Sequence, residues 1–245
     1  MVSAIAWRLG TVTDITDETT TVRSFRLDVP GWPGHRAGQH LDLRLTAEDG
    51  YSVERSYSIA SAADGSSVDI TVERIPDGEV SAFLHDTVVV GDRLELRGPI
   101  GGYFVWEPAN GGPLLLVGGG SGVVPLMAML RDRMRQASTV ATRLLSSSRH
   151  LEDIIYREEL DRLANAGDGL EVIHTLTRSQ PVGWTGYARR IDDRMLAEVA
   201  DPLGSSLRAY ICGPTALVET AANALSRLGL PPDRIRTERF GPTGT

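Results

Sequence analysis

The sequence predicts a two-domain protein: an N-terminal antiparallel β-barrel followed by a C-terminal α/β domain with a parallel sheet. In the first hundred residues, apolar and polar residues alternate in short segments separated by Gly, Pro and Asp turns, which is typical of antiparallel strands. After a turn-rich segment at 107–113, continuous apolar runs alternate with amphipathic stretches, which indicates a parallel sheet covered on both faces. We therefore predict domains at 1–108 and 109–245.

The N-terminal elements follow from period-two alternation. Apolar residues alternate with polar ones in the segments 25–29, 41–45 and 68–72. Because successive side chains of a strand point to opposite faces, each segment has one face suited to a core. Only one helix is predicted in this half, from about Ser81 to His85.

The C-terminal elements alternate regularly between strand and helix. Strands are predicted at 114–117, 140–145, 170–176, 209–212 and 235–238. Helices are predicted at about 125–136, 152–163, 192–199 and 214–228. Parallel strands need long crossover connections, and these helices supply them.

Composition and charge exclude several classes of protein. The 245 residues are 41% hydrophobic and 23% charged, as in an ordinary soluble protein. A net charge of −7 argues against nucleic-acid binding, which needs a basic surface. No apolar stretch approaches ~18 residues, so no membrane span is expected. The start of the chain lacks the basic and apolar regions of a secretion signal, and we expect a cytoplasmic protein.

The single cysteine, Cys212, excludes several metal and redox devices. No disulfide can form within the chain, and no cysteine-rich zinc site is available. A protein-bound [2Fe–2S] cluster would need about four cysteines. We interpret the scattered histidines as surface or packing residues and predict no metal site: His35, His40, His85, His150 and His174.

A glycine turn follows the first apolar run of the C-terminal half. The segment Gly120-Ser-Gly122-Val-Val-Pro125 comes directly after 114–117 and opens a helical stretch. Glycines there let the backbone approach a phosphate at a helix N-terminus. A tight strand-to-helix turn without a ligand also uses glycine, so this alternative stays open. Pro125 stands where the common dinucleotide fingerprint has its third glycine, so the turn is a variant of that motif.

Four further motifs occur along the chain: 55–58 (Arg-Ser-Tyr-Ser), 76–81 (Pro-Asp-Gly-Glu-Val-Ser), 98–101 (Gly-Pro-Ile-Gly) and 212–214 (Cys-Gly-Pro). Together with the glycine turn, they resemble the motifs of the ferredoxin-NADP reductase family, in the same order. The resemblance covers essentially the whole chain. It implies an FAD-binding barrel and an NAD(P)H-binding α/β domain.

The resemblance assigns the strand 55–58 to the flavin. Arg55 would face a flavin phosphate through its planar fork. Tyr57 would pack on the isoalloxazine ring, and Ser58 would lie near the reactive N5. Ser56 belongs to the same cofactor-binding strand. Taken alone, an alternation of Arg and Tyr also fits the two faces of any strand.

The turn at 76–81 would hold the flavin diphosphate. Free amides and the dipole of a helix N-terminus attract an anion. The residues implied in this contact are Gly78, Glu79, Val80 and Ser81. The alternative for Ser81 is a plain helix N-cap. Farther on, Tyr103 and Phe104 either cover the adenine or pack at the domain interface.

The resemblance assigns Gly120, Gly122, Pro125, Gly213 and Pro214 to the nicotinamide nucleotide. It places Cys212 toward the C4 edge of the nicotinamide, where a compact thiol helps shape a stacked geometry for hydride transfer. The alternative is an ordinary buried core cysteine.

The C-terminal Glu238-Arg-Phe240 resembles, more loosely, the family's ending, in which a carboxylate and an aromatic residue lie near the flavin. The predicted catalytic residues are therefore Ser58, Cys212 and Glu238.

The nucleotide preference depends on the second strand of the α/β domain. That strand ends in Ser146-Ser-Ser148-Arg149, without the acidic residue that would hold an NAD ribose. Arg149, with Arg178 as a candidate partner, could instead hold a 2′-phosphate; the alternative is a solvated loop arginine. We favour NADPH over NADH.

The predicted function is a reductase that moves electrons from NAD(P)H through FAD to a separate acceptor: a ferredoxin, an oxygenase component or another metalloprotein. One alternative is a free-flavin or diaphorase-type reductase. Another is a non-catalytic flavin- or nucleotide-binding regulatory subunit, which would have no need of the hydride-transfer residues. We expect a monomer.

Overall fold

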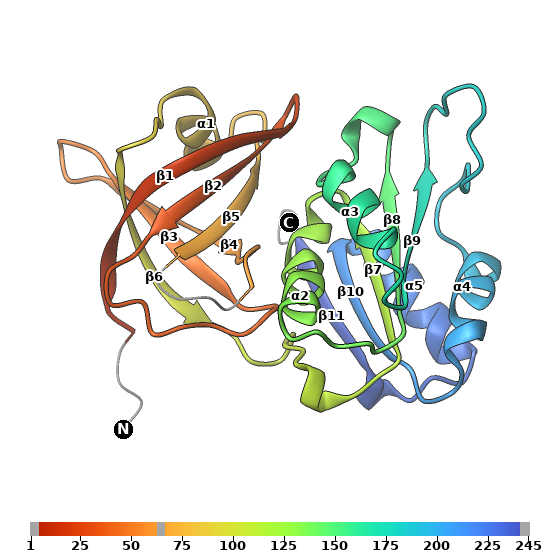
Figure 1. Ribbon diagram of the computed structural model, residues 1–245. Helices are drawn as coiled ribbons and strands as arrows, with labels where there is room; N and C mark the ends of the chain where they lie inside the picture. Colours follow the sequence, from red (N-terminus) through yellow and green to blue (C-terminus); the bar gives the residue numbers. More distant parts are fainter. Residues whose placement is uncertain (1–4, 63–66, 241–245) are drawn as a thin grey trace. The chain divides into compact units, whose positions relative to one another are not determined.

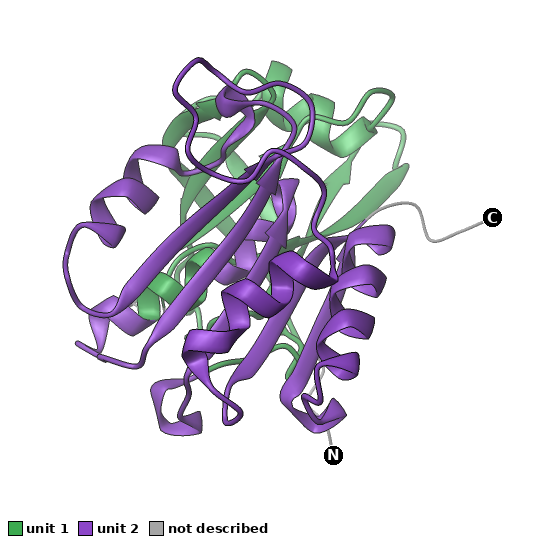
Figure 2. Cartoon of the chain, turned by 90° about the vertical axis from the view of Figure 1, so that its right-hand side faces the viewer, with its two compact units in different colours: residues 1–106, 127–132 green, residues 107–126, 133–245 purple. Residues whose placement is uncertain are grey.

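A computed structural model describes residues 5–62 and 67–240 of the chain. The chain divides into two compact units (Figure 2). Unit 1 comprises Met1–Trp106 and Met127–Asp132, and unit 2 comprises Glu107–Leu126 and Arg133–Thr245. Residues 1–4 lie outside the described residues, and they form part of the segment for which the sequence predicts no secretion signal.

Unit 1 is a six-stranded antiparallel sheet in the order β4-β3-β6-β1-β2-β5 (Figure 1). Its strands are β1 (Trp7–Thr19), β2 (Val22–Asp28), β3 (His40–Thr46), β4 (Ser52–Ser58), β5 (Ser67–Glu73) and β6 (Arg93–Ile100). A bridge between Ile59 and Ile70 joins the ends of the row, so the sheet curls into the predicted barrel.

The apolar residues of the segments predicted to alternate face the core of the barrel. The apolar residues of β2, β3 and β5 pack in one cluster that includes the fully buried Phe25, Leu43 and Ile70, and Leu45 packs against it partly buried. The sequence did not single out β1, because two register shifts interrupt its pairing with β2 and break the period-two pattern.

The helix of unit 1, α1 (Glu79–Asp86), begins two residues earlier than predicted. Its N-cap is Gly78, so Ser81 lies in the first turn and the alternative of Ser81 as N-cap is wrong. The acidic Glu79 in the first turn and His85 in the last turn suit the helix dipole.

Unit 2 is a five-stranded parallel sheet in the order β11-β10-β7-β8-β9. Its strands are β7 (Leu114–Gly119), β8 (Thr142–Ser148), β9 (Leu170–Leu176), β10 (Arg208–Pro214) and β11 (Ile235–Phe240). The chain moves outward from β7 to β9 and then returns to the other side of β7. The strand order therefore reverses between β7 and β10, where open α/β sheets bind ligands at the carboxyl ends of strands.

Helices cover both faces of this sheet. They are α2 (Val123–Arg135), whose middle part, Met127–Asp132, is grouped with unit 1, and α3 (Arg157–Ala164), α4 (Asp193–Ala200) and α5 (Thr215–Arg227). Leu115 and Val117 join the core formed with α4 and α5, while Leu114 and Leu116 on the opposite face are equally buried. Among the described residues, no helix is long and apolar enough to cross a membrane.

One predicted helix is shorter than expected. The stretch predicted as a helix over 152–163 contains a 3₁₀ turn, Leu151–Asp153, and the α-helix starts only at Arg157. Tyr156 is buried with a φ of 60°, a left-handed conformation that a continuous α-helix cannot contain. The buried Ile154 and Ile155 explain why the sequence looked like one apolar helix face.

Candidate active site

The strand β4, which the sequence resemblance assigns to the flavin, presents two different faces. In its antiparallel register with β3, Arg55 and Tyr57 project to one side, and Glu54 and Ser56 project to the other. The Ser56 hydroxyl donates a hydrogen bond to Asp42 at 2.6 Å. The structure thus brings Arg55 and Tyr57 together and turns the Ser56 side chain away from them. Any contact of Ser56 with a ligand on the Arg55 face would have to use its backbone.

The electrostatics of Arg55 and Tyr57 suit an anionic aromatic ligand. Burial raises the pKa of Tyr57 to about 12, and the nearby Arg55 counteracts part of that rise. The phenol therefore stays protonated at neutral pH and can donate a hydrogen bond. The Arg55 Nη1 donates to the Glu54 carbonyl at 2.8 Å, and no carboxylate among the described residues forms an ion pair with Arg55. Its charge is available for a phosphate.

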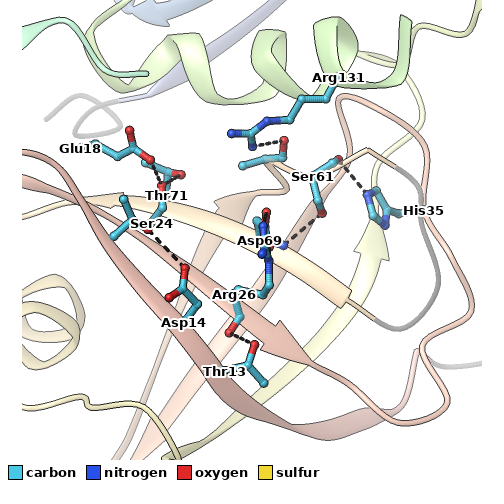
Figure 3. Close-up of polar contacts among 12 residues, drawn as sticks. Thr13, Asp14, Glu18, Ser24, Arg26, His35, Ser61, Asp69, Thr71 and Arg131 are labelled. Carbon is cyan, nitrogen blue, oxygen red and sulfur yellow. Dashed lines mark hydrogen bonds and ion pairs between the residues drawn. The ribbon is translucent and has the colours of Figure 1, made fainter. Parts of the chain in front are cut away.

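The end of β4 is braced by polar contacts (Figure 3). Ser58 is buried at this end, opposite His40 in the register. Two residues later, the Ala60 carbonyl accepts a hydrogen bond from Arg131 at 2.8 Å. The backbone N–H of Asp69 donates to the Ser61 hydroxyl at 3.0 Å.

His35 completes this brace. Its Nδ1 accepts a hydrogen bond from the Trp32 indole at 3.2 Å, so its Nε2 carries the proton and donates to the Ser61 carbonyl at 3.1 Å. Burial lowers the pKa of His35, which keeps the ring neutral in this arrangement. These contacts hold the chain just beyond Ser58 on both sides.

The turn before α1 is built around Gly78. A Cβ there would lie 2.5 Å from the Ser81 hydroxyl and 3.0 Å from the Ile75 carbonyl, so no larger residue fits. The buried Ser81 hydroxyl accepts from the Ile75 N–H and donates to the Gly78 carbonyl, both at 3.2 Å. Within the part of the chain that the structure describes, no side chain caps the N-terminus of α1, so the amides of Glu79 and Val80 remain suited to an anion.

In unit 2, the glycine turn and the Cys-Gly-Pro segment come together although about 90 residues separate them. A 3₁₀ turn, Gly120–Gly122, joins β7 to α2, and Gly120 has a positive φ of 54°. A Cβ on Gly122 would lie 2.2 Å from the Cys212 carbonyl oxygen. Gly213, with a φ of 149°, packs in the same way against Gly119. The backbone therefore carries no side chains at Gly122, after β7, and at Gly213, at the end of β10, which are the two strands between which the strand order reverses.

Both prolines lie where a helix starts. Pro125 is in the first turn of α2, where its missing N–H is not needed, and Pro214 is the N-cap of α5. Phe240 is aligned with Pro214 at the end of β11. These three residues surround the same carboxyl edge of the sheet.

Cys212 and Glu238 are direct neighbours in the parallel register of β10 and β11. Cys212 is fully buried, and burial together with the Glu238 charge raises the pKa of its thiol. Cys212 is therefore a neutral thiol at neutral pH and not an activated nucleophile. Burial also raises the pKa of Glu238 to about 7.

Glu238 has an unusual hydrogen-bonding state. Its Oε2 atom is buried and has no hydrogen-bond partner among the described residues. A buried polar atom without a partner is uncommon in native proteins, and a bound ligand is one explanation for it. The orphaned carboxyl oxygen beside Cys212 thus fits a cofactor-binding position.

The loops after β8 and β9 are joined by three consecutive contacts. Thr177 donates to the Ser148 carbonyl through its N–H at 3.0 Å and its hydroxyl at 3.2 Å. The Arg178 N–H donates to the Arg149 carbonyl at 3.0 Å. His150 Nδ1 and the Ser179 hydroxyl lie 2.6 Å apart.

These contacts place Arg149 and Arg178 side by side along the backbone. Both are exposed, and neither has a carboxylate partner among the described residues. Sequence reasoning linked Arg178 to Arg149 only as a candidate and missed the contact between His150 and Ser179. No local pattern indicates that contact, because it depends on how β8 pairs with β9.

The antiparallel barrel has an uncapped helix N-terminus after a glycine turn, and the parallel sheet has glycine backbone where its strand order reverses. This combination is typical of a flavin- and nicotinamide-dependent oxidoreductase. Comparisons with protein families support both halves. The oxidoreductase FAD-binding domain family matches residues 9–105. The oxidoreductase NAD-binding domain family matches residues 116–223.

A comparison with an individual relative identifies the family within this class of oxidoreductases. The chain is 36% identical over 209 residues to ferredoxin–NADP reductase B of Sorangium cellulosum, covering 83% of this chain and 84% of that protein. It therefore belongs to the ferredoxin-NADP reductase family, which confirms the family and the fold predicted from the sequence, and its cofactors are FAD and NAD(P)H.

Other relatives are reductase components. The chain is 33% identical over 235 residues to the glycine betaine monooxygenase reductase subunit of Pseudomonas aeruginosa, covering 94% of this chain but only 63% of that protein. Among solved structures, the FAD/NAD-binding domain of nitric oxide dioxygenase from Vibrio cholerae has a TM-score of 0.85 at 26% identity. That match covers 96% of this chain and 99% of the domain.

Proposed function

We propose that the protein is a reductase that takes hydride from NAD(P)H onto FAD and passes the electrons to a separate protein acceptor. The acceptor would be a ferredoxin, an oxygenase component or another metalloprotein. One observation carries the proposal. Cys212, the Glu238 carboxyl group with its unpartnered oxygen, and the closely packed glycines Gly122 and Gly213 lie together where the strand order of the parallel sheet reverses. A module that only binds nucleotides has no need of a thiol and a carboxyl group there.

In the proposed flavin site, Arg55 neutralises a phosphate and Tyr57 sets the plane of the ring. Ser58, held by the brace beyond β4, offers its hydroxyl to the ring edge near N5. The backbone amides of residues 78–81 donate hydrogen bonds to the diphosphate. The Ser81 hydroxyl stabilises the turn through its hydrogen bonds to Ile75 and Gly78. FAD, when bound, supplies the conversion between two-electron and one-electron transfer.

In the proposed nucleotide site, the backbone of Gly120, Gly122 and Gly213 lets the dinucleotide approach closely, and Pro125 and Pro214 start the flanking helices. Cys212 shapes the surface on which the nicotinamide lies. Hydride transfer needs reacting atoms at about 3–3.5 Å, so orientation is the main contribution of these residues.

At the same edge, Glu238 holds a proton close to neutral pH, and Phe240 lies beside it in β11. We propose that Glu238 hydrogen-bonds a cofactor group through its orphaned oxygen, and that Phe240 shields the site from water.

Anaerobic addition of NAD(P)H to the yellow purified protein tests the proposal. We expect the flavin absorbance to bleach and to recover when oxidised ferredoxin is added. Absence of bleaching would favour the non-catalytic binding subunit. Loss of flavin on gel filtration, with rapid turnover of added free flavin, would favour the free-flavin reductase.

We further propose that NADPH is the preferred donor. The backbone contact between Arg149 and Arg178, and the lack of a carboxylate partner for either among the described residues, support this choice, because two arginines can clamp a 2′-phosphate. Arg149→Ala should raise KM for NADPH about 10-fold or more, the loss of one charge-assisted contact, and leave KM for NADH unchanged. Arg162→Ala, an exposed arginine on α3, is the control. Equal effects on both donors, or a parent enzyme that prefers NADH, would refute the assignment.

We also propose a monomer that works in the cytoplasm, where NAD(P)H is available. Light scattering at several concentrations should show a constant mass near that of one 26.5 kDa chain. Cell fractionation tests the location.

A further inference from the structure

His35 is a buried histidine to which the proposed chemistry assigns no role. It is 7% exposed and lies in the β2–β3 loop (residues 29–39). Its Nδ1 accepts from the Trp32 indole, and its Nε2 donates to the Ser61 carbonyl. A buried imidazole with a partner at each nitrogen has a fixed orientation, and it joins the two segments that it contacts.

The β2–β3 loop is itself anchored to the Gly-Pro-Ile-Gly motif at the end of β6. The Gln39 side chain, which is also 7% exposed, donates from Nε2 to the Gly101 carbonyl at 2.6 Å. The Trp32 ring packs on Gly98, where a Cβ would lie 2.9 Å from the indole carbon Cη2. His35 therefore projects from a loop that is fixed to the end of β6.

On its other side, the β2–β3 loop holds the residues that follow Ser58. The Ile59 N–H donates to the Gln39 carbonyl at 3.0 Å. Two residues later, the Ser61 carbonyl accepts from His35 at 3.1 Å (Figure 3). Because each residue has only two soft backbone dihedrals, holding Ile59 and Ser61 restricts the backbone next to Ser58.

We infer that His35 is a positioning residue for flavin reduction, which acts by holding the segment 59–61 so that the Ser58 hydroxyl keeps its place near the flavin N5. The inference rests on the proposed role of Ser58. A displacement of about 1 Å near reacting atoms costs about 100-fold in rate. Since His35 makes one of several contacts to this segment, its removal should cause a smaller shift and a loss of about 10-fold.

The test measures flavin reduction by NAD(P)H in the FAD-loaded protein, by anaerobic, single-turnover stopped-flow. His35→Leu keeps the bulk of the side chain but neither hydrogen bond, and it should lower the limiting rate about 10-fold. The NAD(P)H concentration that gives half this rate should not change, because the proposed nucleotide site belongs to unit 2. His35→Gln should restore most of the rate, since its amide can donate to the Ser61 carbonyl as Nε2 does.

His85→Leu is the matched control. His85 is 9% exposed, and its Nε2 lies 2.9 Å from the Val72 carbonyl oxygen, so it is another buried histidine of unit 1 bonded to the backbone. It has no contact with the segment that follows Ser58 among the described residues. We expect His85→Leu to keep the parent rate, even if the protein becomes less stable.

A double-mutant cycle with Ser58→Ala tests whether His35 acts through Ser58. Ser58→Ala should slow flavin reduction at least as much as His35→Leu does. In the Ser58→Ala background, His35→Leu should then cause no further loss, because two substitutions that act on one interaction are not additive. A 10-fold loss from His35→Leu in both backgrounds would overturn the inference.

A parent rate in His35→Leu, or no recovery in His35→Gln, would overturn it as well. If His35→Leu does not fold, Trp32→Phe replaces it, because this change removes the indole N–H that orients His35. Its rate should fall about 3-fold, and an unchanged rate would contradict the inference. A parent rate in Ser58→Ala would show that the proposed role of Ser58 is wrong and would remove the basis of the inference. Failure of the parent protein to bleach would refute the proposed function itself.

Discussion

The two units of this protein offer opposite kinds of surface to their proposed ligands. In unit 1, side chains project from an antiparallel strand, with Arg55 and Tyr57 on one face of β4. In unit 2, the important feature is the lack of side chains, at Gly122 and Gly213. The site in unit 1 should therefore be impaired by truncating side chains, and the site in unit 2 by adding a side chain to a glycine.

This difference follows from the two kinds of sheet. A strand at the end of the antiparallel row has alternate side chains free to meet a ligand, so recognition can be built from the residues of one short motif. A parallel sheet is covered by helices on both faces and leaves its carboxyl edge for ligands. Loops from distant parts of the chain crowd there, and a close approach of backbone to ligand requires glycine.

The largest expected effect is that of Gly122→Ala, which adds one methyl group to unit 2. The new Cβ would lie 2.2 Å from a backbone oxygen of Cys212, and neither atom can move as a flexible side chain would. A displacement of about 1 Å at such a site costs about 100-fold in rate. We expect flavin reduction by NAD(P)H, measured by stopped-flow, to slow by about that factor while FAD content is unchanged.

Gly102→Ala is the control for this substitution, because its Cβ would meet only the end of the Arg36 side chain at 3.7 Å. A normal reduction rate in Gly122→Ala would show that the bare backbone is not required.

The second-largest effect is expected in unit 1, where a side chain is truncated and not added. Arg55→Ala should weaken FAD retention about 10- to 100-fold, since a charge-assisted hydrogen bond contributes roughly 1.5–3 kcal/mol. Flavin release on dilution measures it. Arg26→Ala removes another arginine of the barrel, one paired with Asp69, and should leave retention unchanged. Equal retention in parent and Arg55→Ala would show that phosphate binding does not depend on this side chain.

The third effect tests the thiol at the switch point. Cys212→Ala should slow flavin reduction about 10- to 100-fold, or roughly 1.4–2.7 kcal/mol of barrier, because an orientation contact is lost while the hydride donor and acceptor remain. Single-turnover, anaerobic stopped-flow isolates this step from the acceptor. An unchanged rate, or a loss of folding in place of rate, would make Cys212 an ordinary core residue.

The smallest effect concerns Glu238 and pH. Its folded-state pKa is raised to about 7 from the ordinary 4.5, so the folded state binds more protons than the unfolded state between these values. The stability of the folded protein therefore falls as pH rises from about 4.5 to 7. One pKa unit corresponds to about 1.4 kcal/mol, and the side chain is only partly buried, so we expect a change on the order of 1–2 kcal/mol.

Glu238→Gln removes this titration. Denaturant unfolding of the flavin-free protein should show a flatter pH dependence for the variant and a higher stability than the parent at pH 8. A parallel pH dependence in both proteins would mean that Glu238 is hydrated and titrates normally.

Local patterns in the sequence were sufficient for most of the fold. The alternation in β2, β3 and β5 and the continuous runs in β7 and β10 mark strands whose burial on one face or both decides their composition. The prediction was wrong where local backbone conformation overrode the apolar pattern, as at the left-handed Tyr156. It was incomplete at β1, whose register shifts erase the alternation.

The sequence by itself determined the two-unit architecture, the family and the motifs proposed to bind the cofactors, because these depend on the order of residues along short segments. Tertiary structure decided which side chains meet. It turned Ser56 toward Asp42, set Glu238 beside Cys212, placed Arg178 next to Arg149 and joined Tyr51 to Glu79. Each of these pairs joins different strands or loops, or a strand and a helix, so it depends on strand register and crossover connections that no local pattern encodes.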